Sequence, residues 1–295
     1  MRIQHFLVIL LLINTSYIYA APDIKNAQQS SADYSAWGGA ITQDQSTTLW
    51  EIQSKNYFGE REILEREQQD VIRIHAPSRA ENDALVPVRV ETNLPKNSTE
   101  KINKLYLSID VNPAPMAGIF SLSSARNLEG LETRVRVNGY TYIRAIAEMD
   151  NGKLYMDKQW VKSRGAGCSA PPGKDQAEHQ KQLGKMRFKV ASHSSDTEDS
   201  KFVQLMISHP NNTGMQKDQL TTQFIPQNYI KEIEVLFDKE RVLKAKTTFS
   251  LSENPSFRFR FDGDESGELI AIAKDTENNV FMHKEKIGTN VSSNR

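Results

Sequence analysis

The chain of 295 residues carries 37 basic and 37 acidic side chains, so its formal net charge at pH 7 is zero. A balanced charge provides no general attraction to nucleic acid or to an anionic membrane surface. The length is sufficient for two modest domains, and the hydrophobic content of 38% suits β-sandwiches in which each sheet exposes one face to water.

The N-terminus predicts export. Arg2 precedes the apolar run 6–13, and small residues follow at Ala20 and Ala21. This is the pattern of a secretory signal peptide, and the apolar run is shorter than the roughly 20 residues that span a bilayer. We therefore expect residues 1–20 to be a cleaved signal peptide, with an uncleaved anchor as the alternative.

Residues 21–45 are rich in Gln, Ser, Ala and Asp, show no periodicity and predict a loose N-terminal lead-in. A short helix is expected to start within 48–53, with Ser46 or Asp44 as its N-cap.

Hydrophobic residues then alternate with polar ones, which predicts β-strands in a first domain over residues 46–161. Asn151-Gly152 is a strong signal for a two-residue hairpin turn. Strands are expected at 71–74, 86–91, 105–111, 133–137, 141–147 and 153–156. Short strands at this spacing favour an antiparallel sandwich.

The same two-residue period returns in a second, smaller all-β domain over residues 185–288, followed by a tail at 289–295. Strands are expected at 186–190, 203–207, 233–237, 257–261 and 269–273.

Residues 162–184, between the two domains, contain Cys168, the only cysteine of the chain. Glycine and proline interrupt helices and strands, so the residues around Cys168 predict a flexible, exposed arm. The residues expected to give this flexibility are Gly165, Gly167, Pro171, Pro172 and Gly173. An unpaired cysteine in an exported protein indicates intermolecular bonding or a reactive thiol.

The thiolate is the nucleophilic form of cysteine, and nearby positive charge lowers the pKa of the thiol. Lys162, Arg164 and Lys174 are the cations close in sequence to Cys168. If Val161 is the last fixed residue, Cys168 lies 168 − 161 = 7 residues beyond it. The sulfur then reaches at most about 25 Å from that anchor.

Several segments resemble the two subunits of SoxYZ, a periplasmic sulfur-carrier complex. The segments that resemble SoxZ, the smaller subunit, are 207–215, 225–230, 254–259 and 266–269. The segments that resemble SoxY, the larger subunit, are 75–77 and 84–88. The order of the two parts in one chain is similar to the fused SoxYZ-like carriers associated with quinoprotein dehydrogenases.

The resemblance implies two immunoglobulin-like antiparallel β-sandwiches that pack on each other, in an all-β fold joined by the arm. It implies that Cys168 carries a sulfur-containing intermediate covalently between periplasmic redox enzymes of a sulfur-oxidising or quinoprotein dehydrogenase system. The protein is then a carrier without a cofactor and not a catalyst. In SoxY the cysteine lies on an arm at the C-terminal end of the chain, with the sequence Gly-Gly-Cys-Gly-Gly. Here the arm is internal, and Ser169 and Ala170 follow Cys168 in place of the two glycines.

Three alternatives remain from the residues alone. Cys168 could be the nucleophile of an enzyme with His179 or His209 as base, although a Gly/Pro loop supplies neither a fixed base nor an oxyanion site. Metal binding is disfavoured because the six histidines are isolated and Cys168 has no partner at ligand spacing. The protein could also be a non-catalytic adaptor that docks on a dehydrogenase, with Cys168 incidental.

Overall fold

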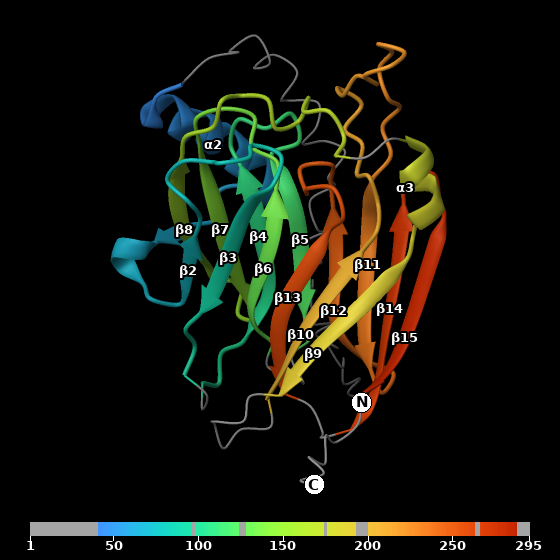
Figure 1. The fold of residues 1–295 in the computed structure, drawn as a ribbon. Coiled ribbons are helices and arrows are strands. Elements are labelled where there is room, and N and C mark those ends of the chain that lie inside the picture. Colours follow the sequence, from blue (N-terminus) through green and yellow to red (C-terminus); the bar gives the residue numbers. More distant parts are fainter. Residues whose placement is uncertain are drawn as a thin grey trace, which may run out of the picture.

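The computed structural model describes residues 41–95, 98–123, 128–173, 176–192, 200–262 and 266–287. The expected signal peptide, residues 21–40 of the lead-in and the expected tail lie outside these residues, and the last three residues of the lead-in, 43–45, are helical. The described chain folds into two β-sheets packed face to face, which confirms the expected all-β class (Figure 1).

The larger sheet has nine strands, in the order β1-β8-β7-β4-β5-β12-β11-β14-β15. Their bounds in that order are Ile63–Glu65, Leu154–Val161, Thr141–Met149, Ile102–Ile109, Met116–Leu122, Glu240–Thr247, Ile230–Phe237, Gly267–Asp275 and Val280–Ile287. β1 pairs with β8 in parallel, and the other strand pairs of this sheet are antiparallel. A short 3₁₀ helix, η2 (Arg66–Gln68), follows β1.

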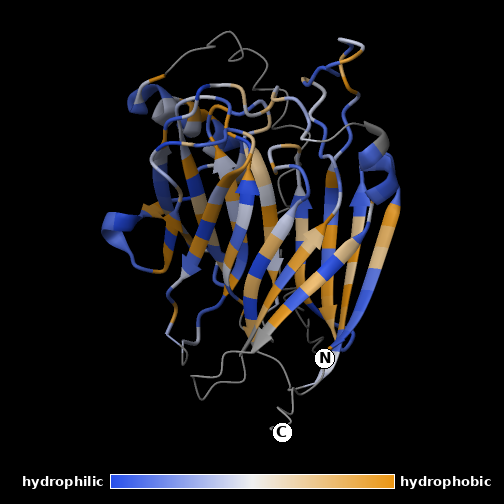
Figure 2. Ribbon diagram, in the orientation of Figure 1, coloured by the Kyte–Doolittle hydropathy of each residue, from blue (hydrophilic) through white to orange (hydrophobic). Residues whose placement is uncertain are grey.

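The smaller sheet has six antiparallel strands, in the order β2-β3-β6-β13-β10-β9. Their bounds in that order are Ile72–His75, Val86–Thr92, Glu129–Val135, Ser256–Asp262, Ser200–Ile207 and Met186–Ser192. Hydrophobic residues are concentrated in the strands, whereas α3 (Gln176–Gln182) is largely hydrophilic (Figure 2).

Both sheets run without interruption from the first half of the chain into the second. In the larger sheet β5 pairs with β12, from Gly118–Thr247 to Leu122–Leu243. In the smaller sheet β6 pairs with β13 at Glu132–Arg258. Between the sheets, Phe120 from the first half and Phe257 from the second pack with ring centroids 6.1 Å apart. The two halves therefore share one hydrophobic core and pack on each other.

Helix α2 (Gln43–Phe58) covers the outer face of the larger sheet with Trp50, Tyr57 and Phe58. A capping box starts it: the Thr42 hydroxyl accepts from the Gln45 amide, and the Gln45 side chain accepts from the Thr42 amide. The helix therefore begins at Gln43, and the expectation that Ser46 or Asp44 caps it is wrong.

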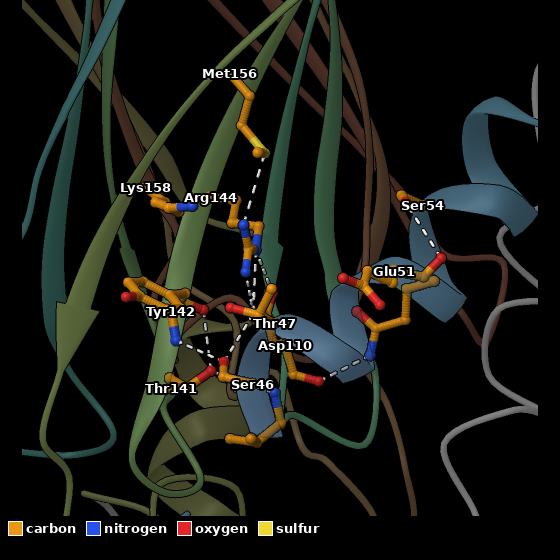
Figure 3. Close-up of polar contacts among 12 residues, drawn as sticks. Ser46, Thr47, Glu51, Ser54, Asp110, Thr141, Tyr142, Arg144, Met156 and Lys158 are labelled. Carbon is orange, nitrogen blue, oxygen red and sulfur yellow. Dashed lines mark hydrogen bonds and ion pairs between the residues drawn. The ribbon is translucent and has the colours of Figure 1, made fainter. Parts of the chain in front are cut away.

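The Ser46 hydroxyl instead donates a hydrogen bond to Asp110, which forms a buried ion pair with Arg144 under the helix (Figure 3). Arg144 Nε lies 3.0 Å from Asp110 Oδ1, and neither side chain is exposed to solvent. Ser46 Oγ donates to Asp110 Oδ2 at 2.7 Å, and the Arg144 guanidinium stacks 4.9 Å from the centre of the Trp50 ring. Gln53 adds a hydrogen bond to the Asp110 carbonyl. The pair thus fixes α2 to β7 and to the end of β4.

No helix in the described ranges combines the length and the apolarity needed to cross a membrane.

Replacing Arg144 with Leu should destabilise the protein by about 3–5 kcal/mol, because Asp110 would remain as a buried charge without its partner. Urea unfolding followed by circular dichroism measures this difference. Arg73→Leu is the control, because Arg73 forms a surface pair with Asp70 and its loss should leave the free energy of unfolding nearly unchanged. Equal effects of the two substitutions would contradict the role given to the buried pair.

Candidate functional site

Residues 163–173, called here the cysteine segment, run over the end of the sandwich that is drawn at the top of Figure 1. The segment is folded by local hydrogen bonds. The Ser163 hydroxyl donates to the Val137 carbonyl at 2.9 Å and accepts from the Gly165 amide at 3.1 Å. The Ser169 amide closes a turn on the Ala166 carbonyl. The expectation of an exposed thiol is wrong for this conformation, in which Cys168 is buried and the segment is packed on the protein. The flexibility expected of the segment stays a prediction.

The thiol of Cys168 is completely buried, with 0% of the residue exposed. Burial raises the pKa of the thiol to about 12, because removal from water disfavours the charged thiolate. At neutral pH Cys168 is therefore a protonated thiol in this conformation, and the thiol is a poor nucleophile.

The positive charge that opposes this rise of the pKa belongs to Arg136. Arg136 follows β6, is 1% exposed, and has a pKa lowered by its own burial. Its Nη1 donates to the Gly167 carbonyl at 3.2 Å and its Nη2 to the Asn211 carbonyl at 3.4 Å. Its buried Nε has no hydrogen-bond partner among the described residues. A buried guanidinium thus connects the cysteine segment to a loop of the second half.

Residues from both halves hold the backbone around Cys168. From the first half, Asn138 Oδ1 accepts from the Cys168 amide at 3.3 Å. From the second half, Thr213 Oγ1 donates to the Cys168 carbonyl at 2.6 Å, and Gln216 Nε2 donates to the Ala170 carbonyl at 3.0 Å. We call Arg136, Asn138, Thr213 and Gln216 the seat of the cysteine segment.

The glycines next to Cys168 permit close contact as well as turning. A Cβ atom on Gly167 would lie 2.3 Å from the Asp83 carbonyl oxygen and 2.4 Å from that of Val137, so no larger residue fits here without movement. Gly165 has φ +96°, which other residues rarely adopt. A Cβ on Gly173 would meet the flexible Glu253 side chain, whose carboxylate accepts from the Gly173 amide. Pro171 is exposed and Pro172 is half-buried.

The cations expected to support the thiolate do not form the seat. Lys162 is exposed, and its backbone pairs with Ser78 and Ala80. Arg164 is exposed, and its amide donates to Asp83 Oδ2. Lys174 lies outside the described residues. The cation that acts on Cys168 is Arg136, which lies 32 residues away in sequence (168 − 136).

The two histidines considered as bases are both buried in a separate cluster. His209 Nε2 lies 3.6 Å from Asp275 Oδ2, and its Nδ1 accepts from the Asn211 amide at 3.1 Å. Burial lowers the pKa of His209, with Asp275 opposing this effect and His179 adding to it. No hydrogen bond between described residues joins either imidazole to the Cys168 thiol. The geometry therefore gives no nucleophile–base pair.

Across the described part of the chain, no group of three or more His, Cys, Asp or Glu side chains is arranged to hold a metal ion.

Two family models match the chain, one for each half. Residues 54–168 match the model of the sulfur oxidation protein SoxY, and residues 188–286 match that of the sulphur oxidation protein SoxZ. The chain contains a SoxY domain followed by a SoxZ domain. The SoxY match ends at Cys168, the residue that the seat encloses. A search of curated proteins found no match.

Among solved structures, the sulfur carrier protein SoxY from Chlorobium limicola f thiosulfatophilum is 26% identical, with 40% of this chain and 98% of that chain covered and a TM-score of 0.33. A superoxide reductase (neelaredoxin) from Ignicoccus hospitalis is 16% identical over 34% of this chain and 94% of that chain, with a TM-score of 0.29. The domain assignment rests on the family models, because these TM-scores are low.

Replacing Gly167 with Ala should expel the cysteine segment from its seat, because the new methyl group would overlap two carbonyl oxygens. We expect alkylation of Cys168 by iodoacetamide at pH 7.5 to become at least about tenfold faster. This corresponds to a loss of about 1.4 kcal/mol from the seated state, a modest value for a core overlap. Gly173→Ala is the control, because only a flexible side chain meets its Cβ. Equal rates in the two variants would contradict the close packing at Gly167.

The pH dependence of the same reaction tests the burial of the thiol. The seated thiol has a pKa of about 12, whereas a free thiol titrates near 8.5. A raised pKa means that the seated state loses stability relative to the open state as the pH rises above about 8.5. The alkylation rate of the unaltered protein should therefore still rise between pH 8.5 and 10, whereas that of the urea-unfolded chain should level off. A plateau near pH 8.5 in both states would show that the thiol is not buried in solution.

Proposed function

We propose that the protein is an exported carrier that binds a sulfur-containing intermediate covalently on Cys168 and presents it to partner redox enzymes. The observation that carries this proposal is that the only cysteine of the chain is the last residue of the SoxY match and is held by both the SoxY and the SoxZ domain. Among the described residues no histidine is hydrogen-bonded to the thiol, and on this proposal the partners carry out the chemistry of the cargo.

Loading requires that the cysteine segment first leaves its seat, since the seated thiol is both inaccessible and protonated. Once in water, the thiol loses its proton more readily. The Cys168 thiolate then attacks a sulfur atom of an oxidised donor, a new S–S bond forms, and the leaving group departs with the electron pair of the broken bond. Release is a second exchange at the same sulfur.

We place this carrier in the periplasm, on the basis of the signal-peptide pattern in residues 1–20. We also propose that a quinoprotein dehydrogenase system supplies or receives the cargo. This association is supported by the resemblance of the fused SoxY–SoxZ order to carriers of that type.

The burial of the thiol also favours a second candidate function. A cysteine that is 0% exposed and has a pKa of about 12 has the properties of a structural residue. The protein would then be a non-catalytic adaptor for a dehydrogenase, with Cys168 serving only to pack the cysteine segment.

Intact mass spectrometry of the protein isolated from its native host, before and after a thiol reductant, distinguishes the two functions. A carrier should show an added mass that maps to Cys168 and disappears on reduction. Cys168→Ser should abolish the adduct and sulfur-dependent electron transfer while leaving the melting temperature within a few degrees. An unmodified thiol under every growth condition, together with full function of Cys168→Ser, would instead establish the adaptor.

The Thr213 hydroxyl should control how often the thiol becomes accessible. Thr213→Val removes the hydrogen bond to the Cys168 carbonyl, which is worth about 1 kcal/mol, and the one that the hydroxyl accepts from the Met215 amide, so alkylation of Cys168 should become at least about fivefold faster. Thr47→Val is the control, because its hydroxyl bonds only within helix α2. An unchanged rate in Thr213→Val would show that the Thr213 hydroxyl does not restrain the segment.

A further inference from the structure

A groove of ≈730 Å³ lies on the outer face of the smaller sheet. It crosses β2, β3, β6, β13 and β10, so its walls come from both domains. We call it the arginine groove, because Arg89, Arg134 and Arg258 line it. None of the residues that line it belongs to the cysteine segment or to the seat.

Three chain connections link the groove to the cysteine segment or to Lys162, which directly precedes it. Lining residue Pro77 precedes Ser78, whose carbonyl accepts from the Lys162 amide. Lining residue Arg134 lies two positions before Arg136, which bonds Gly167.

The third connection runs through the second domain. Arg134 Nη2 donates to the Asn254 carbonyl, and Asn254 follows Glu253, whose carboxylate accepts from the Gly173 amide. The upper end of the groove and the cysteine segment are therefore linked through residues that are neighbours in the chain. This end of the smaller sheet is at the top of Figure 1.

Positive charge exceeds negative charge along the groove. Its lining includes the three arginines and a single carboxylate, that of Glu132, and Arg89 also pairs with Glu91, which lies outside the lining. Glu132 is already engaged, because its Oε2 accepts from Arg258 Nη1 at 3.0 Å and its Oε1 lies 3.7 Å from Arg89 Nε. Arg134 pairs with a backbone carbonyl and, among the described residues, with no carboxylate.

One donor of the groove also lacks an acceptor. Arg258 Nε is buried and has no hydrogen-bond partner in the described part of the protein. A guanidinium offers its N–H groups in a planar fork that fits the oxygen atoms of an oxyanion. Arg258 Nη1 and Nη2 already donate to Glu132 Oε2 and to Gln204 Oε1, so an oxyanion would replace one of these acceptors and would add the negative charge that the groove lacks.

We propose that the arginine groove is an oxyanion-binding site that receives the anionic sulfur group carried on Cys168 after the cysteine segment leaves its seat. This inference rests on the proposed carrier function. The volume exceeds that of a small oxyanion alone and accommodates such a group together with the side chain that bears it. Arg134 provides the contact nearest to the seat, and Arg258 provides the contact across the domain junction.

The first experiment tests the groove without the chemistry of the thiol. The full chain with Cys168→Ser is titrated with thiosulfate at constant ionic strength, with chloride as the reference anion, and binding is followed by calorimetry and by the NMR signals of arginine Nε–H groups. We expect saturable binding that is at least about tenfold weaker in Arg134→Gln or Arg258→Gln, since each removes a charged hydrogen bond of about 1.5–3 kcal/mol.

Two further variants serve as controls for this titration. Arg260→Gln changes an arginine two residues from Arg258 on the same strand that does not line the groove, so binding should be retained. Glu132→Gln removes the carboxylate that competes for Arg258 and Arg89, so binding should become stronger. No saturable binding, or equal weakening by Arg260→Gln and Arg258→Gln, would overturn the proposal.

The second experiment tests the attached group. Cys168 is converted to a mixed disulfide with a sulfonatoethyl or an uncharged ethyl methanethiosulfonate. The thiol loses its proton, the new S–S bond forms, and methanesulfinate leaves. The anionic adduct should protect groove amides from hydrogen exchange and the uncharged adduct should not, with protection lost in Arg134→Gln. Identical exchange for both adducts would overturn the proposal.

The two experiments also separate this inference from the carrier function. Thiosulfate binding by Cys168→Ser does not depend on whether the thiol is ever loaded in the cell. Absence of a native adduct on Cys168 would disprove the carrier and leave the binding result intact, whereas absence of binding would disprove the groove and leave a native adduct intact.

Discussion

The pairing of β5 with β12 and of β6 with β13 is the constraint on which the rest of the structure depends. Each pairing joins an edge of the SoxY domain to an edge of the SoxZ domain, so that two sandwiches become one double layer. Unpaired sheet edges are exposed to unwanted association, and this arrangement satisfies them within the chain. It also fixes the loops of both domains at one end of the sandwich, where the cysteine segment lies.

The seat exists because of this alignment. Arg136 and Asn138 follow β6, which pairs with β13, and Thr213 and Gln216 lie in the loop between β10 and β11. The cysteine segment is thus packed between elements of two domains whose sheets are continuous. Arg136 is buried at considerable cost in hydration, which the carbonyl groups of Gly167 and Asn211 offset in part.

Much of the fold could be predicted from the alternation of hydrophobic residues, but not all of it. In strands with one solvent-exposed face, such as β3 and β13, hydrophobic and polar residues alternate, so the sequence predicts these strands. β5 lacks this alternation, because α2 covers its second face and both sides of Met116–Phe120 are buried. β15 is an edge strand whose residues are partly or fully exposed, so hydrophobicity gives little signal there. Thr42 was missed as a cap because it precedes any apolar periodicity.

The sequence predicts Cys168 as the centre of the candidate site, but it does not predict the seat residues that surround it. The lone cysteine and its glycines marked the segment, yet the same glycines that indicated flexibility serve close packing, as Gly167 shows. The alternation around Val135 placed Arg136 on a solvent-facing side, and only the tertiary structure reveals that the cysteine segment covers it. Thr213 and Gln216 are 45 and 48 residues from Cys168 (213 − 168 and 216 − 168), so no local pattern connects them.

The position of Cys168 inside the chain also has a kinetic consequence. β8 ends at Val161 and β9 begins at Met186, so the segment is tethered on both sides and not on one. A doubly tethered loop loses less conformational entropy when it returns to a fixed contact than a free chain end does, which raises its effective concentration at the seat. After each exchange the thiol would therefore be withdrawn from solution rapidly. In the periplasm, the compartment that we propose for this protein, this would limit the time during which an unpaired cysteine can react with the wrong partner.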